Sequence, residues 1–278
     1  MKQNLIDLHT HSTVSDGLYS PEELVNFASR AGIMAISLTD HDTIDGLDEA
    51  AAASKKAGIE FIPGIEIGIL HEGEEIHLLG YYLDNYNIIK QELKLQKEER
   101  LNRMRAMVNR VLEMGIKITL DEVLAESGNA APGRMHLARV LVQRRYVHSV
   151  NQAFQLYLKK DGPAYIPRKT ITLEQSLKLL SNTAKITAIA HPKNINTSLL
   201  RQLVDKGLSA IEVFHPEHSR ERTDYYKMFA AKNKLLVTGG SDFHGDKDKT
   251  VYPTKLAISY SYLEKIKSYI YGDCTFLD

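Results

Sequence analysis

The sequence predicts an α/β protein: a distorted (β/α)7 TIM-like barrel with a helical insertion over the C-terminal rim. Short apolar runs alternate with helical patterns in the first and last parts of the chain, which is typical of a parallel sheet covered by helices. Residues 90–165 lack this alternation and show only helical spacing. The length of 278 residues suits one large barrel or two ordinary domains.

The first part of the chain predicts alternating strands and helices. Ser20, Pro21 and Glu23 form an N-cap, a first-turn proline and a capping-box acid, which predict a helix that ends at Gly32. The pair Pro63-Gly64 predicts a break in the third strand. We expect strands at residues 5–9, 34–39, 59–70 and 75–83, and helices at 21–31 and 45–56.

The middle of the chain predicts helices alone. Between residues 88 and 114 apolar side chains such as Leu93, Leu101 and Val108 recur at helical spacing among charges. Further helices are expected at 120–126, 135–145 and 150–159. We therefore expect residues 90–165 to form a substrate lid, and residues 1–89 and 166–278 to form the metal-binding barrel.

The alternation then resumes, and it predicts that the same barrel is completed by the last part of the chain. Strands are expected at 186–190, 210–214, 235–238 and 256–259, with helices at 173–183, 198–206, 220–233 and from 262 onward. The helices between successive strands favour parallel pairing.

The composition excludes several classes of function. Lys plus Arg equals Asp plus Glu at 35 each, so no global positive field attracts DNA or anionic lipid. No apolar run approaches the roughly 18 residues that span a bilayer. Cys274 is the only cysteine, which excludes an internal disulfide and favours a reducing compartment. We expect a cytoplasmic protein with no obligate protein partner.

Histidines and acids at predicted strand ends carry the strongest chemical signal. His9 and His11 lie two apart in extended chain, so both point to the same side. The other candidates follow or end later strands: Asp16, His41, Glu66, His77, His191, His215, Asp242 and His244. Strand carboxyl ends share one rim of a barrel, and a divalent cation compensates buried donors that would otherwise cost several kcal/mol each. Zinc, manganese or iron suits this donor set.

Each position also has a structural interpretation. A single histidine at a strand end is more often a hydrogen-bonding group than a ligand, and Ser-Asp-Gly around Asp16 is an ordinary turn sequence. Asp7 and Asp40 are candidates to fix an imidazole tautomer, with packing or capping as the alternative. We expect surface or packing roles for the remaining histidines, His71, His136, His148 and His218.

The segments IDLHTHSTVSDG, SLTDHDTIDG, PGIEI, HLLGYYL, AHP and GGSDFHG resemble the successive motifs of the PHP (polymerase and histidinol phosphatase) family. The insertion, with Gly133-Arg134-Met135-His136-Leu137-Ala138, further resembles a branch of small bacterial enzymes. That branch is similar to 3′,5′-nucleoside bisphosphate phosphatases and to a 5′→3′ exoribonuclease that trims short RNAs.

The resemblance implies two or three divalent ions (Mn²⁺, Zn²⁺ or Fe²⁺) in adjoining sites. One ion would be held by His9, His11, Glu66 and Asp242, a second by Glu66, His77 and His191, and a third by Asp16, His41 and His244. Some relatives carry histidine in place of Asp16, which leaves the third ion open.

Such ions would activate a bridging hydroxide for in-line attack on phosphorus. This agrees with the lack of a Gly-x-Ser-x-Gly or Walker-type motif in the sequence. His215 is the candidate general acid. Arg134 is the first candidate for binding a second phosphate, because guanidinium binds phosphate bidentately, and Arg168 and Lys193 follow it.

The leading hypothesis is a phosphoesterase acting on nucleotide monoesters such as nucleoside 3′,5′-bisphosphates. A 5′→3′ exoribonuclease acting on short 5′-phosphorylated RNA is the alternative, although neutral net charge favours small substrates. An amidohydrolase-like C–N hydrolase also begins with His-x-His, but no lysine follows a strand where its carbamate bridge belongs. A non-catalytic metal-binding module is the remaining alternative.

Overall fold

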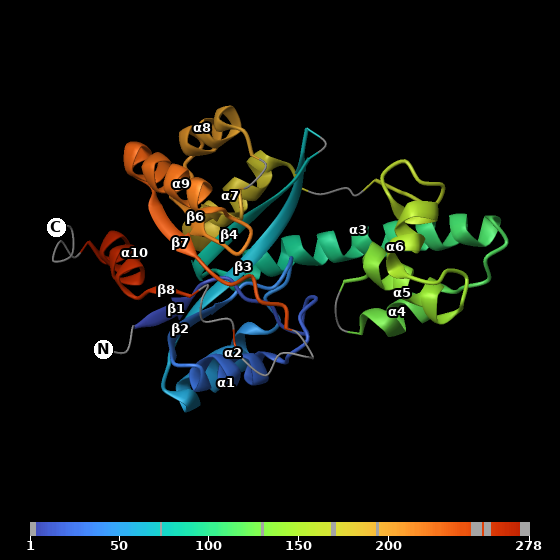
Figure 1. Cartoon of the computed structure of the whole chain (residues 1–278), viewed down its shortest axis with the longest axis horizontal. Coiled ribbons are helices and arrows are strands. Elements are labelled where there is room, and N and C mark those ends of the chain that lie inside the picture. The colour runs from blue at the N-terminus through green and yellow to red at the C-terminus, as the bar shows by residue number, and fades with distance from the viewer. Residues whose placement is uncertain are drawn as a thin grey trace. The chain divides into compact units, whose positions relative to one another are not determined.

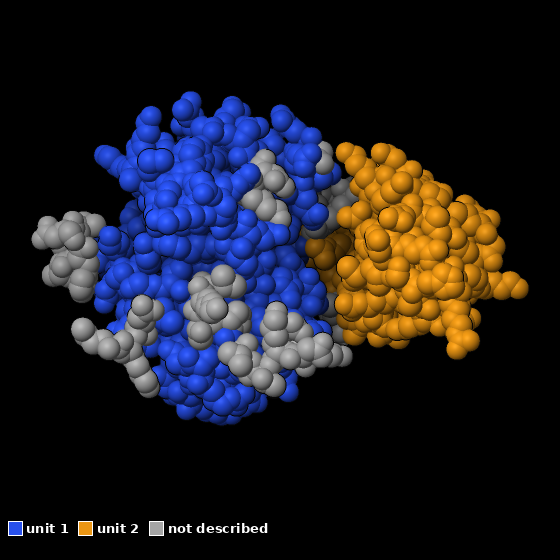
Figure 2. Space-filling view, in the orientation of Figure 1, with its two compact units in different colours: residues 1–90, 171–278 blue, residues 91–170 orange. Residues whose placement is uncertain are grey.

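The computed structural model describes residues 4–72, 74–128, 131–167, 171–192, 195–245, 252 and 257–272. The chain divides into two compact units, residues 1–90 with 171–278 (unit 1) and residues 91–170 (unit 2) (Figure 2). Arg168, Lys193 and Cys274 lie outside the described residues. None of the helices in the described ranges combines the length and apolar character that a bilayer crossing requires.

Unit 1 is built on one eight-stranded sheet with the order β7-β6-β5-β4-β3-β2-β1-β8 (Figure 1). Directly after β1, the Leu8 backbone N–H donates to the carbonyl of Gly239, the last residue of β7, at 3.2 Å. The sheet therefore curls into a nearly closed barrel, which confirms the predicted TIM-like fold class. Its strands are β1 (Leu5–Asp7), β2 (Ile33–Leu38), β3 (Glu60–His71), β4 (Glu74–Leu83), β5 (Ala184–Ile189), β6 (Ala210–Phe214), β7 (Leu236–Gly239) and β8 (Ile258–Ser259).

The sheet is mixed, whereas the alternation of strands and helices predicts parallel pairing throughout. β4 runs antiparallel to both β3 and β5, because the short connection between β3 and β4 permits a hairpin but no crossover helix. The predicted break at Pro63-Gly64 is also wrong. β3 continues through this pair and changes neighbour there, since its residues up to Pro63 pair with β2 and those from Gly64 pair with β4.

Helices cover the barrel on both sides of β3 and β4. α1 (Pro21–Arg30) and α2 (Leu47–Ala57) pack beside β2 and β3, while α7 (Leu173–Thr183) and α9 (Arg220–Asn233) pack beside β5 and β6 (Figure 1). The capping box of Ser20 and Glu23 begins α1 as predicted. The other helices of this unit are α8 (Thr197–Asp205) and α10 (Ser261–Tyr271). The barrel interior is filled by apolar residues such as Ile6, Ile62 and Ala188.

Unit 2 is helical and has its own core. α3 (Tyr86–Glu113) begins in unit 1 and supplies Met104, Met107 and Val111 to this core, where α5 (Arg134–Gln143) adds Leu137 and Leu141. The other elements are α4 (Leu120–Ser127), α5 (Arg134–Gln143), α6 (Val150–Ala153) and the π-helix η1 (Phe154–Leu158). The helix expected at 150–159 therefore widens into a π-turn in its second half. The role of this unit as a lid stays a prediction.

Candidate metal centre

The predicted histidines and acids of unit 1 converge at one end of the barrel. His9 and His11 follow β1, His41 follows β2, and His191 follows β5. Asp242 and His244 follow β7, where the Asp242 N–H donates to the His9 carbonyl at 2.9 Å. Glu66 and His77 lie inside the β3–β4 hairpin rather than at a strand end. From Gly64 onward β3 pairs with β4 instead of β2. This part of the hairpin places two more donors, Glu66 and His77, over the same rim.

Glu66 is the centre of this cluster. Its side chain is fully buried, and the carboxylate contacts five imidazoles that lie on or directly after four different strands. Oε2 lies 3.3 Å from His9 Nε2, 3.3 Å from His11 Nε2 and 3.0 Å from His41 Nδ1, and Oε1 lies 2.8 Å from His77 Nδ1 and 2.9 Å from His191 Nε2. Each of the two carboxylate oxygens thus faces its own set of histidines, and a bridging ligand requires this arrangement.

Three groups of side chains in the described residues could hold a metal ion. In each group the donor atoms lie within 4.8 Å of one another. The groups are His9, His11, Glu66 and Asp242; His41, Glu66 and His77; and His11, Asp16, His41 and His244. His191 joins the second group through its 2.9 Å contact with Glu66. The grouping differs from the expected one in that His11 and His41 are each close enough to serve two groups.

The buried donor atoms fit a metal better than they fit one another. Among the described residues, His9 Nε2, both ring nitrogens of His11 and Glu66 Oε2 are buried without a hydrogen-bond partner. His9 Nε2 and His11 Nε2 nevertheless lie 3.1 to 3.4 Å from oxygens of Glu66 and Asp242. An unsatisfied buried polar atom costs about 1–3 kcal/mol, and a cation between converging lone pairs removes that cost. His, Asp and Glu donors suit Zn²⁺, Mn²⁺ or Fe²⁺.

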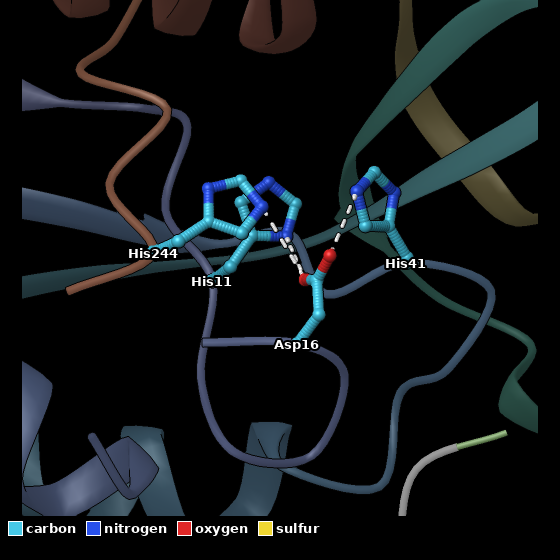
Figure 3. A group of neighbouring side chains, drawn as sticks. All are labelled: His11, Asp16, His41 and His244. Atoms are coloured by element: carbon cyan, nitrogen blue, oxygen red, sulfur yellow. Dashed lines mark ion pairs between the residues drawn. The ribbon is translucent and has the colours of Figure 1, made fainter. Parts of the chain in front are cut away.

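The group around Asp16 is the open side of the cluster. Figure 3 shows its carboxylate pointing toward His11, His41 and His244, with Asp16 Oδ1 3.3 Å from His244 Nε2 and Oδ2 3.8 Å from His41 Nε2. The Asp16 side chain is 48% exposed, whereas those of His11 and Glu66 are fully buried. Solvent and a ligand can therefore approach the cluster from the Asp16 side.

The electrostatics keep the acids ionised and one imidazole neutral. Burial opposes charge on Glu66, yet His41, His9 and His77 hold the pKa of its carboxyl well below the usual range. Burial, with His41 and His244 nearby, lowers the pKa of His11 to about 3, so one ring nitrogen keeps a lone pair free for a ligand bond. At His77, burial is outweighed by the attraction of Glu66, which raises the pKa to about 10.

Two residues of the centre have left-handed backbone conformations. His191 has a φ of 27° and Asp242 a φ of 50°. For non-glycine residues this region costs roughly 1–2 kcal/mol, and such conformations persist where the surrounding structure fixes them. The unfavourable backbone conformations of His191 and Asp242 therefore direct both side chains into the cluster.

Asp7 and Asp40 do not fix an imidazole. Asp7 Oδ1 accepts the N–H groups of His9 at 3.3 Å and Ser241 at 2.9 Å, and Oδ2 accepts the Tyr252 hydroxyl at 2.7 Å. Asp7 thus fastens the segment before Asp242 to β1.

Asp40 accepts the N–H and hydroxyl of Ser12 and the hydroxyl of Ser15, each at 2.6 Å. It fastens the loop that carries Asp16. Glu212 in β6 instead contacts the ring of His9, at 2.9 Å from Nδ1. The sequence patterns missed Glu212, although a lone acid inside the apolar run Ala-Ile-Glu-Val-Phe was a usable signal.

His215 lies against Asp242 with only 1% of its side chain exposed. Its Nδ1 accepts the Glu217 backbone N–H at 3.2 Å, which leaves the proton on Nε2, 3.3 Å from Asp242 Oδ2. His215 therefore touches a candidate ligand directly. Its assignment as the general acid stays a prediction.

Arg134 is the first residue of α5 in unit 2. Its guanidinium lies 5.7 Å from the ring of Phe154 and 5.6 Å from that of Tyr165, and Nη1 donates to the Leu158 carbonyl at 3.4 Å. Stacking on two aromatic rings holds the guanidinium in place. Its role in phosphate binding stays a prediction, and the other two candidates, Arg168 and Lys193, are outside the described residues.

A cavity of about 310 Å³ borders the cluster within unit 1. His41, His77, His191 and Asp242 are among the residues that line it, and Ile76 and Ile195 contribute apolar surface. A ligand in this cavity would contact donors of more than one candidate group at once. The described residues that line the cavity all belong to unit 1.

Comparisons with known proteins agree with this geometry. A family model described as the PHP domain matches residues 7–236. The 5′-3′ exoribonuclease of Haemophilus influenzae is 33% identical over 246 residues, covering 86% of this chain and 89% of the relative. The 3′,5′-nucleoside bisphosphate phosphatase of Chromobacterium violaceum is 32% identical over 247 residues, covering 86% and 87%. The crystal structure of a proposed metal-dependent phosphoesterase from Bifidobacterium adolescentis has a TM-score of 0.80 at 30% identity and 96% coverage of both chains.

Proposed function

This chain belongs to the PHP domain family of metal-dependent phosphoesterases, and on that premise we propose that it hydrolyses nucleotide phosphate monoesters such as nucleoside 3′,5′-bisphosphates. The observation that carries this proposal is the fully buried Glu66 in contact with five imidazoles. A buried anion among so many metal-type donors is the pattern of a multinuclear centre. We propose that two or three ions bind there, held by the groups of donors described above.

Bound ions would activate a water molecule at neutral pH and neutralise charge on the phosphoryl oxygens. The chain's own residues supply the rest of the geometry. Glu66 faces two histidine sets, so it fixes their separation. Asp16, being half exposed, leaves an approach for the phosphate group. Ile76 and Ile195 line the cavity beside His77 and His191, and their apolar surface suits the uncharged part of a substrate.

The choice of substrate class rests on two further points. The net charge is zero, and long RNA usually requires a basic track. We propose that Arg134 binds a second phosphate, because its guanidinium is held by aromatic rings and can bind phosphate bidentately. A 5′→3′ exoribonuclease acting on short RNA is the second candidate, supported by 33% identity to the Haemophilus influenzae enzyme.

The test is an assay of the purified chain with Mn²⁺ on a nucleoside 3′,5′-bisphosphate, a 5′-phosphorylated short RNA, histidinol phosphate and a dihydropyrimidine. We expect the highest kcat/KM for the bisphosphate. A higher value for the short RNA would move the assignment to the exoribonuclease. Turnover of the dihydropyrimidine alone would replace phosphoesterase activity with C–N hydrolysis.

Arg134→Lys separates binding of a second phosphate from a structural role of the arginine. We expect KM for the bisphosphate to rise by about tenfold, because lysine loses the bidentate contact, while KM for a monophosphate changes little. Arg139→Lys on the same helix is the matched control, since the Arg139 side chain is 48% exposed and pairs with Glu126. An equal rise in KM for both substrates would contradict the assigned role.

A further inference from the structure

Glu212 is a fully buried carboxylate in the middle of β6. Its neighbours within this strand are apolar. Burying an ionised carboxylate costs several kcal/mol unless its oxygens find close partners. The partners of Glu212 therefore indicate why an acid occupies this position.

The two oxygens of Glu212 hold two different candidate ligands. Oε1 lies 2.9 Å from His9 Nδ1, and Oε2 accepts the backbone N–H of His191 at 2.7 Å. His9 follows β1 and His191 follows β5, two strands that are not neighbours in the sheet. One side chain thus connects ligands from opposite parts of the barrel.

The contact with His9 determines which ring nitrogen is available to a metal. With Nδ1 donating its proton to Glu212, the lone pair stays on Nε2. Nε2 lies 3.3 Å from Glu66 and 3.4 Å from Asp242 and has no hydrogen-bond partner among the described residues. The reverse tautomer would place a proton where the candidate ligands converge.

The contact with His191 acts on the backbone. His191 has a φ of 27°, in the left-handed region. The short hydrogen bond from its N–H to Glu212 stabilises this turn, which directs Nε2 to within 2.9 Å of Glu66 Oε1. Without that bond, the more favourable extended backbone would compete.

We propose that Glu212 is a positioning residue of the metal centre, which fixes the tautomer of His9 and the backbone turn of His191 while binding no metal itself. Both of its oxygens are occupied by these contacts. The proposal rests on the metal centre within the proposed function and is independent of the substrate. Partners of metal-ligating histidines typically contribute about 10- to 100-fold to metal affinity.

The test compares Zn²⁺ affinity of the full chain with that of Glu212→Gln, measured by competition with a chromogenic chelator. We expect affinity to fall by about 10- to 100-fold. The matched control is Glu60→Gln. Glu60 also accepts two hydrogen bonds, from Tyr260 at 2.6 Å and Lys267 at 2.7 Å. It lies six positions before Glu66 on β3, about 20 Å away along the strand. The Zn²⁺ affinity of Glu60→Gln should therefore match that of the wild type.

A spectroscopic measurement separates positioning from general destabilisation. In the Zn²⁺-loaded wild type, nitrogen-15 NMR of labelled histidines should show an Nδ1-bound proton on His9 that is protected from solvent exchange. A His9→Gln variant assigns this signal. Protection should be lost in Glu212→Gln and kept in Glu60→Gln. Glu212→Asp, which keeps the charge but is too short to reach both partners, is the second variant if Glu212→Gln does not fold.

Wild-type Zn²⁺ affinity in Glu212→Gln, or a protected His9 proton in that variant, would overturn the proposal. An equal fall in Zn²⁺ affinity in Glu212→Gln and Glu60→Gln would also overturn it, because the fall would then reflect lower stability of the fold. A wild-type chain that binds no Zn²⁺ would overturn both this inference and the metal centre of the proposed function. Zn²⁺ binding without phosphoesterase activity would overturn the substrate assignment and leave the role of Glu212 intact.

Discussion

The candidate metal centre has a closed part and an open part built from the same residue types. In the closed part, His9, His11 and Glu66 are fully buried. In the open part, Asp16 is 48% exposed and His244 34% exposed. A buried donor without a cation pays a desolvation cost, whereas an exposed one keeps its water. Metal should therefore contribute more to the stability of the closed part, and the open part should bind its ion more weakly.

The largest expected effect comes from Glu66→Gln. The variant removes the charge that both histidine sets share, so the ions lose their common ligand. We expect kcat to fall by at least about 10³-fold, since several kcal/mol of transition-state stabilisation is lost. The measurement is phosphatase activity at saturating Mn²⁺ together with metal content. A variant with full metal content and near wild-type kcat would remove Glu66 from the bridging position.

Metal removal tests the closed part next. Chelation leaves its converging donors uncompensated, so the melting temperature should fall. At a metal concentration of 100 Kd, the expected loss is about 2.7 kcal/mol of unfolding free energy. Calorimetry of the metal-loaded and chelated protein gives the comparison. An unchanged melting temperature would mean that the buried donors need no cation.

Gly240→Ala tests how tightly the closed part is packed. A Cβ at this position would collide with the His9 backbone nitrogen and lie 2.8 Å from Asp7 Oδ1. Overpacking of this kind costs about 1–3 kcal/mol, and we expect reduced metal content as His9 is displaced. The control is Gly133→Ala, because a Cβ there meets nothing within 4 Å. Equal unfolding free energies for the two variants would show that the strands tolerate the shift.

The smallest effect is expected from Asp16→Asn, in the open part. The exposed carboxylate contributes little to folding, so the unfolding free energy should change by less than about 0.5 kcal/mol. Affinity for one ion should fall by about tenfold, because the amide is a weaker ligand than the carboxylate. Isothermal titration with Mn²⁺ measures this step. Loss of every metal site in Asp16→Asn would show that the two parts bind their ions as a unit.

Recognition of the site from the sequence depended on residues with a fixed local geometry. His9 and His11 share one side because strand side chains alternate, and strand-end positions predict a common rim for His41, His191 and Asp242. Local rules do not predict pairing partners. The sequence therefore predicts parallel pairing for β3 and β4, which instead form an antiparallel hairpin. It still identifies Glu66 and His77, the two donors that this hairpin carries.

Supporting contacts were harder to predict. Asp7 is a sequence-based candidate for fixing a tautomer, because its parity on β1 matches that of His9, with packing or capping as the alternative. In the structure the ring contact belongs to Glu212, 203 positions away in the chain, and Asp7 holds backbone N–H groups instead. Which carboxylate faces which nitrogen depends on barrel closure, and no periodicity in the sequence encodes it.

By itself, the sequence determined the fold class, the helical character of the middle segment and the residue types gathered at one rim, because these follow from alternation, capping and spacing along the chain. The tertiary structure alone decided that Glu66 faces two histidine sets, that Asp16 stays open to solvent and that Glu212 holds His9 and His191. Those facts are distances between strands far apart in sequence, and only the closing of the sheet sets them.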